Sequence, residues 1–369
     1  MRYPILEIDL KKLRYNAKVE LDYLHKHKIE VMAVNKVFNG MRETAEAVVQ
    51  SGMKVVAESI LDNLIKIKDL NCEKALLRTP GLSEIEDVIK YVDISLVSEI
   101  TIIKALSKEA VRQNKRHKVL IMVDMGDIRE GIWFEETEEI EEAVRKVLEL
   151  PGLEIYGLGT NYGCYGTVLA NEKNTNEFVE LANYLEKKLS TKFKYLSGGN
   201  CSSYYLVEKG TMPNKINHLR MGGQHIFGIE YVEGRYLDGY SHSNKDINKY
   251  VSDAYILKAE IIEIRKKPTV PVGELGVDSF MKSKTFVDRG VRKNAILSFG
   301  LQDVPWENIH PVEEDIQILG QTSNHTIIDI NDTNDKYQLG DIIRFEVDYT
   351  ALMLLCNADS VKKVFLNKQ

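Results

Sequence analysis

The fold is decided by residues 31–40, which have the sequence V-M-A-V-N-K-V-F-N-G. An apolar run of strand length ends at Lys36, a loop with Asn39 and Gly40 follows, and residues 42–49 have the pattern of a helix. This order puts one lysine amine at the carboxyl end of a buried strand, the edge of an α/β sheet where ligands bind. A lysine amine held there is a usable nucleophile. The alternative is a lysine that marks the strand end and points into solvent.

Length and composition limit the classes of protein. The 369 residues exceed one core of usual size, so we expect two domains. A hydrophobic content of 44% is ordinary for a soluble globular protein, and a net charge of −6 argues against binding to nucleic acid or anionic membranes. No apolar run is long enough to span a bilayer or to form a signal peptide. The four cysteines form no C-x-x-C pair, which favours a reduced cytoplasmic compartment and argues against a zinc cluster.

Short apolar strands alternate with helical segments from residue 31 onward. We expect strands at 31–36, 54–59, 75–78, 92–96, 119–124, 153–159, 195–197 and 218–221, most of them followed by a helix. Their continuous apolar runs are typical of a parallel sheet covered by helices. Eight such units predict a closed, TIM-type α/β barrel. The alternative is a doubly wound open sheet, but no G-x-G-x-x-G motif follows the first strand.

The pattern changes after Gly228. Residues 231–250 are rich in Gly, Asp, Ser and Asn and are interpreted as a linker. Alternating strands follow at 254–264, 324–330 and 342–347. We therefore predict a barrel domain over residues 1–235 and a C-terminal all-β domain over residues 236–369. An apolar strand at residues 3–9 precedes the barrel and is a candidate to join the β domain.

Polar side chains follow the carboxyl ends of the expected strands, and in a barrel these ends face one site. The set comprises Lys36, Glu58, Arg78, Asp124, Arg129, Asn161, Asn200 and Arg220. Arg220 differs from the others because it lies inside a strand, where an unpaired charge is costly. It needs a buried partner, for which a heteroaromatic ring nitrogen is one choice. For Arg78 or Arg129, a carboxylate partner at the barrel rim is the alternative role.

Two glycine-rich segments are candidate phosphate cradles. The sequence S-G-G-N-C-S-S at residues 197–203 offers backbone N–H groups with Ser and Asn side chains, although such clusters also form ordinary turns. Gly222 and Gly223 follow the eighth expected strand. A lysine amine, a phosphate cradle and an arginine inside the barrel together suit pyridoxal 5′-phosphate, with Lys36 forming the Schiff base.

Eight motifs carry a resemblance that covers nearly the whole chain. They are I-D-L-K-K-L-R-Y-N-A (8–17), A-V-N-K (33–36), I-M-V-D-M-G-D-I-R-E-G (121–131), G-L-G-T-N-Y-G-C-Y-G (157–166), S-G-G-N-C-S-S (197–203), L-R-M-G (219–222), P-V-G-E-L-G-V-D (271–278) and V-D-Y-T-A-L (347–352). In this register the chain resembles the alanine-racemase-like, fold-type III pyridoxal-phosphate enzymes. Within that family it is most similar to the ornithine racemases.

The resemblance implies roles for the strand-end residues. Lys36 would be the covalent lysine and one catalytic base, and Arg220 would face the pyridine nitrogen. Asn161 would lie near the cofactor ring, and Arg129 near the cofactor O3′ and the substrate carboxylate. The phosphate would be held by Asn200, Ser202, Ser203, Gly222, Gly223 and Tyr349. Cys201 departs from the family pattern, which has a phosphate-binding serine there.

The family works as a head-to-tail homodimer, and racemisation needs a second base on the opposite face of the substrate. The alanine racemase pattern has a tyrosine after a glycine in the β domain. The matching sequence V-G-E-L-G-V-D (272–278) has none, so we expect Glu274, or else Asp278, to take this role. Either one could instead cap a backbone turn. Gln302 and Asp303 are candidates for the substrate side chain.

The arginine at Arg220 favours one reaction type. Because an arginine keeps its proton, it makes the pyridine ring a poorer electron sink, which suits rapid proton return at Cα. We therefore expect a pyridoxal-phosphate-dependent racemase of ornithine, a small-molecule substrate. Lysine, alanine or another amino acid is the alternative substrate. A non-catalytic pyridoxal-phosphate carrier is the alternative of another class, and the β domain with Tyr349 argues against it.

Overall fold

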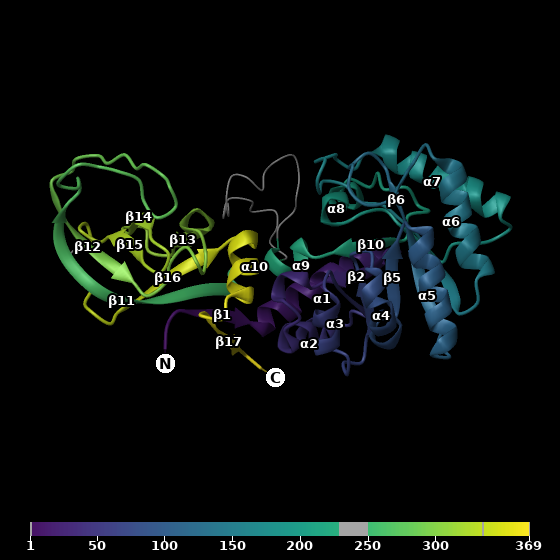
Figure 1. Ribbon diagram of the computed structural model, residues 1–369, viewed down its shortest axis with the longest axis horizontal. Coiled ribbons are helices and arrows are strands. Elements are labelled where there is room, and N and C mark those ends of the chain that lie inside the picture. Colours follow the sequence, from purple (N-terminus) through teal and green to yellow (C-terminus); the bar gives the residue numbers. More distant parts are fainter. Residues whose placement is uncertain (1, 229–249, 334–335, 369) are drawn as a thin grey trace. The chain divides into compact units, whose positions relative to one another are not determined.

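The computed structural model describes residues 2–228, 250–333 and 336–368, which form two compact units (Figure 1). One unit comprises residues 10–252. The other combines the chain up to Asp9 with the chain from Asp253 onward. The domain boundary expected at residues 235 and 236, and nearly all of the expected linker, lie outside the described residues.

The first unit contains a closed barrel of parallel strands within residues 10–228. Its eight strands are β2 (Glu30–Val34), β3 (Val55–Glu58), β4 (Glu73–Leu76), β5 (Ile94–Val97), β6 (His117–Asp124), β8 (Leu153–Gly159), β9 (Tyr195–Ser197) and β10 (His218–Met221). They pair in the order β5-β4-β3-β2-β10-β9-β8-β6, and a β5–β6 pairing closes the barrel. The short strand β7 (Ile132–Trp133) pairs with β6. The expected α/β barrel is confirmed.

Two layers of apolar side chains hold the barrel together. Inside it, Met32, Leu120 and Met122 are fully buried. Ile121 alternates with Leu120 and Met122 along β6 and packs in the separate layer beneath the helices, as expected for a strand with two buried faces. The helices of this unit are α1 (Leu10–Lys26), α2 (Arg42–Gln50), α3 (Leu61–Lys66), α4 (Ile85–Tyr91), α5 (Ile100–Arg112), α6 (Thr137–Glu149), α7 (Glu172–Lys188), α8 (Tyr204–Glu208) and α9 (Gly223–Phe227).

The second unit is built on a sheet that is antiparallel except for the parallel pairing of its first and last strands. Its strands are β1 (Ile5–Asp9), β11 (Tyr255–Pro268), β12 (Val291–Leu297), β13 (Ile309–Pro311), β14 (Gln317–Gln321), β15 (Thr326–Asp329), β16 (Ile342–Val347) and β17 (Lys362–Leu366). The N-terminal strand β1 pairs with β11 and β17 and so belongs to this unit.

This unit also contains a helix that the alternating pattern did not predict, α10 (Tyr349–Asn357). It begins where the Asp348 carboxylate accepts the Ala351 N–H at 2.8 Å, an N-cap contact that ends β16 and starts the helix. The expected all-β domain is therefore a β-sheet unit with one added helix. The helices that the structure describes include none with both the length and the apolar character of a membrane span.

Candidate active site

Lys36 lies at the carboxyl end of the barrel, where β2 ends. It is the first residue of a short 3₁₀ turn (Lys36–Phe38), and its side chain is exposed. The residues on either side, Asn35 and Val37, are buried, and the Asn35 N–H donates to the carbonyl of Ala57 at 2.8 Å. The backbone that carries Lys36 is thus fixed to the barrel, while its amine is free to reach a molecule at the barrel mouth.

Arg220 lies in β10 with 3% of its surface exposed. Its guanidinium donates to Ser197 Oγ at 2.6 Å, to the carbonyl of Thr160 at 2.5 Å and to Asn161 Oδ1 at 2.6 Å. Burial lowers the pKa of Arg220 to about 10, which still leaves it a cation at neutral pH. The structure therefore supplies the buried partners that a charge inside a strand requires, and all three accept hydrogen bonds from it.

Asn161 connects Arg220 to a second arginine through a carboxylate. Its Nδ2 donates to Glu130 Oε1 at 2.6 Å, and the same oxygen accepts from Arg129 Nη2 at 2.5 Å. Arg129, Glu130, Asn161 and Arg220 thus form one continuous network. Glu130 was not identified from the sequence, although it stands beside Arg129 in the D-I-R-E-G segment. Two adjacent opposite charges do not indicate that the carboxylate turns toward Asn161.

Asp127 holds the loop that follows β8 against this network. Its carboxylate accepts the backbone N–H groups of Cys164, Tyr165 and Val168 at 3.0–3.4 Å. Burial raises the pKa of the Cys164 thiol, and the positive charge of Arg129 opposes that rise, as does the more weakly acting charge of Lys36. Lys36 follows β2 and Arg129 follows β6, so both lie at the carboxyl end of the parallel barrel.

The candidate phosphate loop after β9 is ordered by its own side chains. Asn200 Oδ1 accepts the Ser202 N–H at 2.9 Å, and Ser202 Oγ donates to the carbonyl of Tyr162 at 2.9 Å. Ser203 Oγ donates to the carbonyl of Gly198 at 2.9 Å. Gly199 has a φ of +120°, and a Cβ there would lie 2.3 Å from Ser203 Oγ, so the loop requires glycine at this position.

Two backbone N–H groups converge beside this loop. Those of Gly222 and Gly223 both point at Cys201 Sγ, at 3.1 and 2.9 Å. Burial raises the pKa of the Cys201 thiol to about 11, so it is a neutral acceptor at physiological pH. Successive N–H groups aimed at one point are the arrangement that binds phosphate oxygens. A Cβ on Gly222 would lie 3.1 Å from the carbonyl of Val34, so the approach is close. These donors fit a phosphate group.

Glu58 is a second buried ionisable group at this end of the barrel. It ends β3, and Asn63 Nδ2 donates to its Oε2 at 3.3 Å. Burial raises the pKa of Glu58 to about 7. Its Oε1 and Asn35 Oδ1, next to Lys36, are both buried without a partner among the described residues. Arg78, by contrast, lies at the rim and pairs with Glu84 at 2.8 Å, the alternative role considered for it.

The remaining predicted site residues lie in the second unit. Glu274 and Gln302 are exposed, and Tyr349 is the first residue of α10. The Asp278 carboxylate accepts the N–H groups of Phe280 and Lys282 at 2.9 and 3.0 Å, and these contacts lower its pKa.

Asp303 is buried in that same unit. One of its carboxylate oxygens accepts the Gly300 N–H at 3.1 Å, and the other accepts the hydroxyl of Ser360. Asp278 and Asp303 therefore both stabilise turns of their own unit.

Comparisons with known proteins agree with this geometry. The family described as alanine racemase, N-terminal domain, matches residues 8–229. The chain is 37% identical to ornithine racemase of Acetoanaerobium sticklandii, covering 99% of this chain and 100% of that protein. It is 32% identical to lysine racemase of Thermotoga maritima, covering 99% of both.

Solved structures share the fold. One of them is alanine racemase from Bartonella henselae with covalently bound pyridoxal phosphate. It superposes with a TM-score of 0.71 at 17% identity, covering 99% of this chain and all of that chain. At this identity the likeness speaks for the fold alone.

Proposed function

Because the chain belongs to the alanine racemase family, we propose that it is a pyridoxal-phosphate-dependent racemase that interconverts L- and D-ornithine. The relatives confirm the expected family and the expected reaction class. Ornithine is supported by the 37% identity to an ornithine racemase along the full length of both chains. The 32% identity to a lysine racemase makes lysine the second candidate.

The residues at the carboxyl end of the barrel fit the cofactor. When bound, pyridoxal phosphate withdraws electrons from the amino acid attached to it and so acidifies the Cα–H. The ring would be held by Arg220 and Asn161. The phosphate would be held by Asn200, Ser202, Ser203, the N–H groups of Gly222 and Gly223, and Tyr349. The converging N–H groups of the two glycines support this assignment.

Lys36 and Arg220 have different tasks in this proposal. The amine of Lys36 would hold the cofactor and would move the proton at one face of Cα. Arg220 keeps its own proton, because its lowered pKa of about 10 is still well above neutral. A ring nitrogen that faced a group keeping its proton would stay unprotonated. It would then withdraw less electron density from Cα, which favours prompt return of the proton. Arg129 orients the substrate carboxylate, and Glu130 holds Arg129 and Asn161 in place.

The proposal rests above all on the buried guanidinium of Arg220 with its three acceptors. The three acceptors offset the cost of burying the charge and hold the guanidinium in one position, where it would face the cofactor ring.

The second base is assigned to Glu274 in preference to Asp278. The Asp278 carboxylate binds two N–H groups of its own turn, and a carboxyl with a lowered pKa is a weak base. Glu274 is exposed, and none of the described contacts engages its carboxylate. Of the two candidates for the substrate side chain, exposed Gln302 is preferred, because both Asp303 oxygens bind groups within their own unit.

A head-to-tail homodimer completes the proposal. Residues 269–290 of the second unit present large exposed apolar side chains, with Val272 94%, Met281 81% and Val287 76% exposed. Such a patch next to Glu274 is typical of a protein interface, and a second copy of the chain would cover it.

Four free cysteines support a cytoplasmic location.

The direct test is a panel of L-amino acids incubated with the cofactor-loaded protein and followed by loss of optical rotation. We expect rapid loss with L-ornithine and slower loss with L-lysine. Loss with alanine alone would overturn the assignment of the substrate. If every amino acid kept its rotation while the cofactor absorbance band was normal, the carrier function would replace the racemase.

A further inference from the structure

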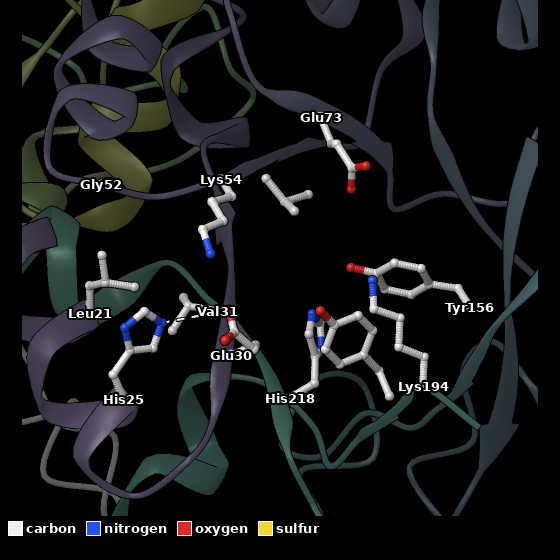
Figure 2. A pocket seen from close by; sticks show the side chains of 12 residues that line it. Leu21, His25, Glu30, Val31, Gly52, Lys54, Glu73, Tyr156, Lys194 and His218 are labelled. Atoms are coloured by element: carbon white, nitrogen blue, oxygen red, sulfur yellow. Dashed lines mark ion pairs between the residues drawn. The ribbon is translucent and has the colours of Figure 1, made fainter. Parts of the chain in front are cut away.

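A cavity of about 370 Å³ opens at the amino end of the barrel (Figure 2). Glu30, Glu73, Tyr195 and His218, which begin β2, β4, β9 and β10, all line it. Because the strands are parallel, their amino ends gather on the face opposite the one that carries Lys36. The cavity is therefore separate from the candidate active site, although both lie in the same unit.

Charges of both signs surround the opening. Lys54 and Lys194 are exposed, and neither ammonium forms an ion pair within the described part of the chain. Glu30 lies 3.6 Å from His25 Nε2, and Glu73 pairs with Lys118. In Figure 2 both side chains extend down from the top of the view, the Lys54 ammonium toward Val31 and Glu30 and the Glu73 carboxylate toward Tyr156. The rim thus offers two ammonium and two carboxylate groups around one cavity.

The floor combines three rings with apolar side chains. The ring centroids of Tyr156 and Tyr195 are 4.6 Å apart, and that of His218 lies 5.1 Å from Tyr195. Leu21 and Val31, both less than 8% exposed, also line the cavity. Such a floor can cover an apolar side chain of a bound molecule.

His218 supplies a buried polar group that the protein leaves without a partner. It is 1% exposed, and its Nδ1 lies 2.8 Å from Ser197 Oγ. Its Nε2 has no hydrogen-bond partner among the described residues. Ser197 Oγ already accepts from Arg220, so its own hydrogen is available to Nδ1, which leaves Nε2 as an N–H donor. A buried donor of this kind is costly unless something accepts from it.

We propose that this cavity is a second binding site, which takes a small zwitterion of the amino-acid class. The ligand carboxylate binds the ammonium groups of Lys54 and Lys194 and lies beside the His218 ring. The ligand ammonium binds the carboxylates of Glu30 and Glu73. The two glutamates would repel a simple anion, and the two lysines would repel a simple cation. A molecule that carries both charges therefore fits best. The proposal does not depend on the chemistry at Lys36.

The test uses N,N-dimethyl-L-valine and the cofactor-loaded protein. This probe is a zwitterion with an apolar side chain, and its tertiary amine cannot condense with a carbonyl, so it cannot react as a substrate. Isothermal titration calorimetry should show one site per chain, and the Lys36→Ala protein should bind the probe equally well. Absence of binding, or its loss in the Lys36→Ala protein, would overturn the proposal.

Paired variants locate the site. The Lys54→Gln/Lys194→Gln protein should bind the probe about tenfold more weakly, as expected for the loss of two partly exposed ionic contacts. Lys104→Gln/Lys108→Gln removes the same charge from exposed positions on α5 and should leave the affinity unchanged. Equal affinities of the two double variants would contradict the proposed site.

Two further readouts examine the chemistry of recognition. Propionate and dimethylammonium each carry one of the two charges, and each should bind at least about tenfold more weakly than the zwitterion. In ¹⁵N spectra, the His218 Nε2 resonance should shift on addition of the probe. Tight binding of either single-charge molecule, or an unmoved His218 resonance at saturation, would contradict the proposal.

Discussion

The buried polar groups at the two ends of strand β10 differ in their charge and in their hydrogen-bond partners. His218 and Arg220 are two residues apart and therefore point to the same side of the strand, and both contact Ser197 Oγ. Burial lowers both pKa values, that of His218 to about 3 and that of Arg220 to about 10. His218 is thus neutral at physiological pH and Arg220 is charged. Three acceptors hold a cation at the carboxyl end, whereas the amino end has a neutral ring whose Nε2 has no partner among the described residues.

The largest expected effect is a loss of racemase activity, caused by a change at the carboxyl end of β10. Arg220→Met removes the buried cation and should lower racemase kcat/KM on the order of a thousandfold, the loss typical of a preorganised electrostatic donor. His218→Gln, two residues away, should change it less than about threefold. Racemisation followed by circular dichroism measures both. Similar losses in the two variants would mean that the ends of β10 do not have separate roles.

Glu58 is another buried ionisable group at the carboxyl end of the barrel. Its Oε1 has no partner among the described residues. Its pKa is raised from 4.5 to about 7, so the unfolded chain releases this proton at lower pH than the folded protein does. This contribution to stability is complete below pH 4.5 and is lost as the pH rises to about 7, with a total of about 3 kcal/mol.

Glu58→Gln should remove that pH dependence. Urea unfolding of the variant and the wild type should give similar free energies at pH 4.5, and the variant should be more stable by up to about 3 kcal/mol at pH 8. Parallel pH profiles of the two proteins would show that Glu58 is ionised in the folded state at neutral pH.

Much of the barrel could be predicted from the sequence, because its strands are continuous apolar runs and their helices follow at regular intervals. The short helices α4 and α9 were not predicted, since their seven and five residues show little periodic pattern. Lys36 and Arg220 could be identified as site candidates from their positions at strand ends. Glu130 could not, because its partners Asn161 and Arg129 depend on how two loops meet.

The Ser197 hydroxyl contacts both His218 and Arg220, so a change at Ser197 affects both ends of β10. Ser197→Ala leaves His218 Nδ1 and one Arg220 N–H without their shared partner, which should cost about 1–3 kcal/mol of stability. Thermal unfolding measures this loss. Ser203→Ala, which removes a hydroxyl bonded to one carbonyl, is the matched control and should cost less. An equal cost in both variants would contradict the shared role.

The smallest expected effect concerns Glu130 as a positioning residue. Glu130→Gln weakens its hold on Arg129. If Arg129 orients the substrate carboxylate as proposed, this should raise KM about tenfold, with a smaller change in kcat. Glu84→Gln breaks the comparable pair with Arg78 at the rim and should leave both constants unchanged. A fall in kcat with no change in KM would show that Glu130 acts on the reaction and not on substrate binding.

We propose that the amine of Lys36 carries the cofactor at the carboxyl end of the barrel. Borohydride reduction of the loaded protein should fix one pyridoxyl phosphate group per chain, and peptide mass spectrometry should find it on Lys36. The Lys36→Ala protein, loaded and reduced in the same way, should carry none. A stable adduct on another lysine, or an adduct that persists in the Lys36→Ala protein, would contradict this role of Lys36.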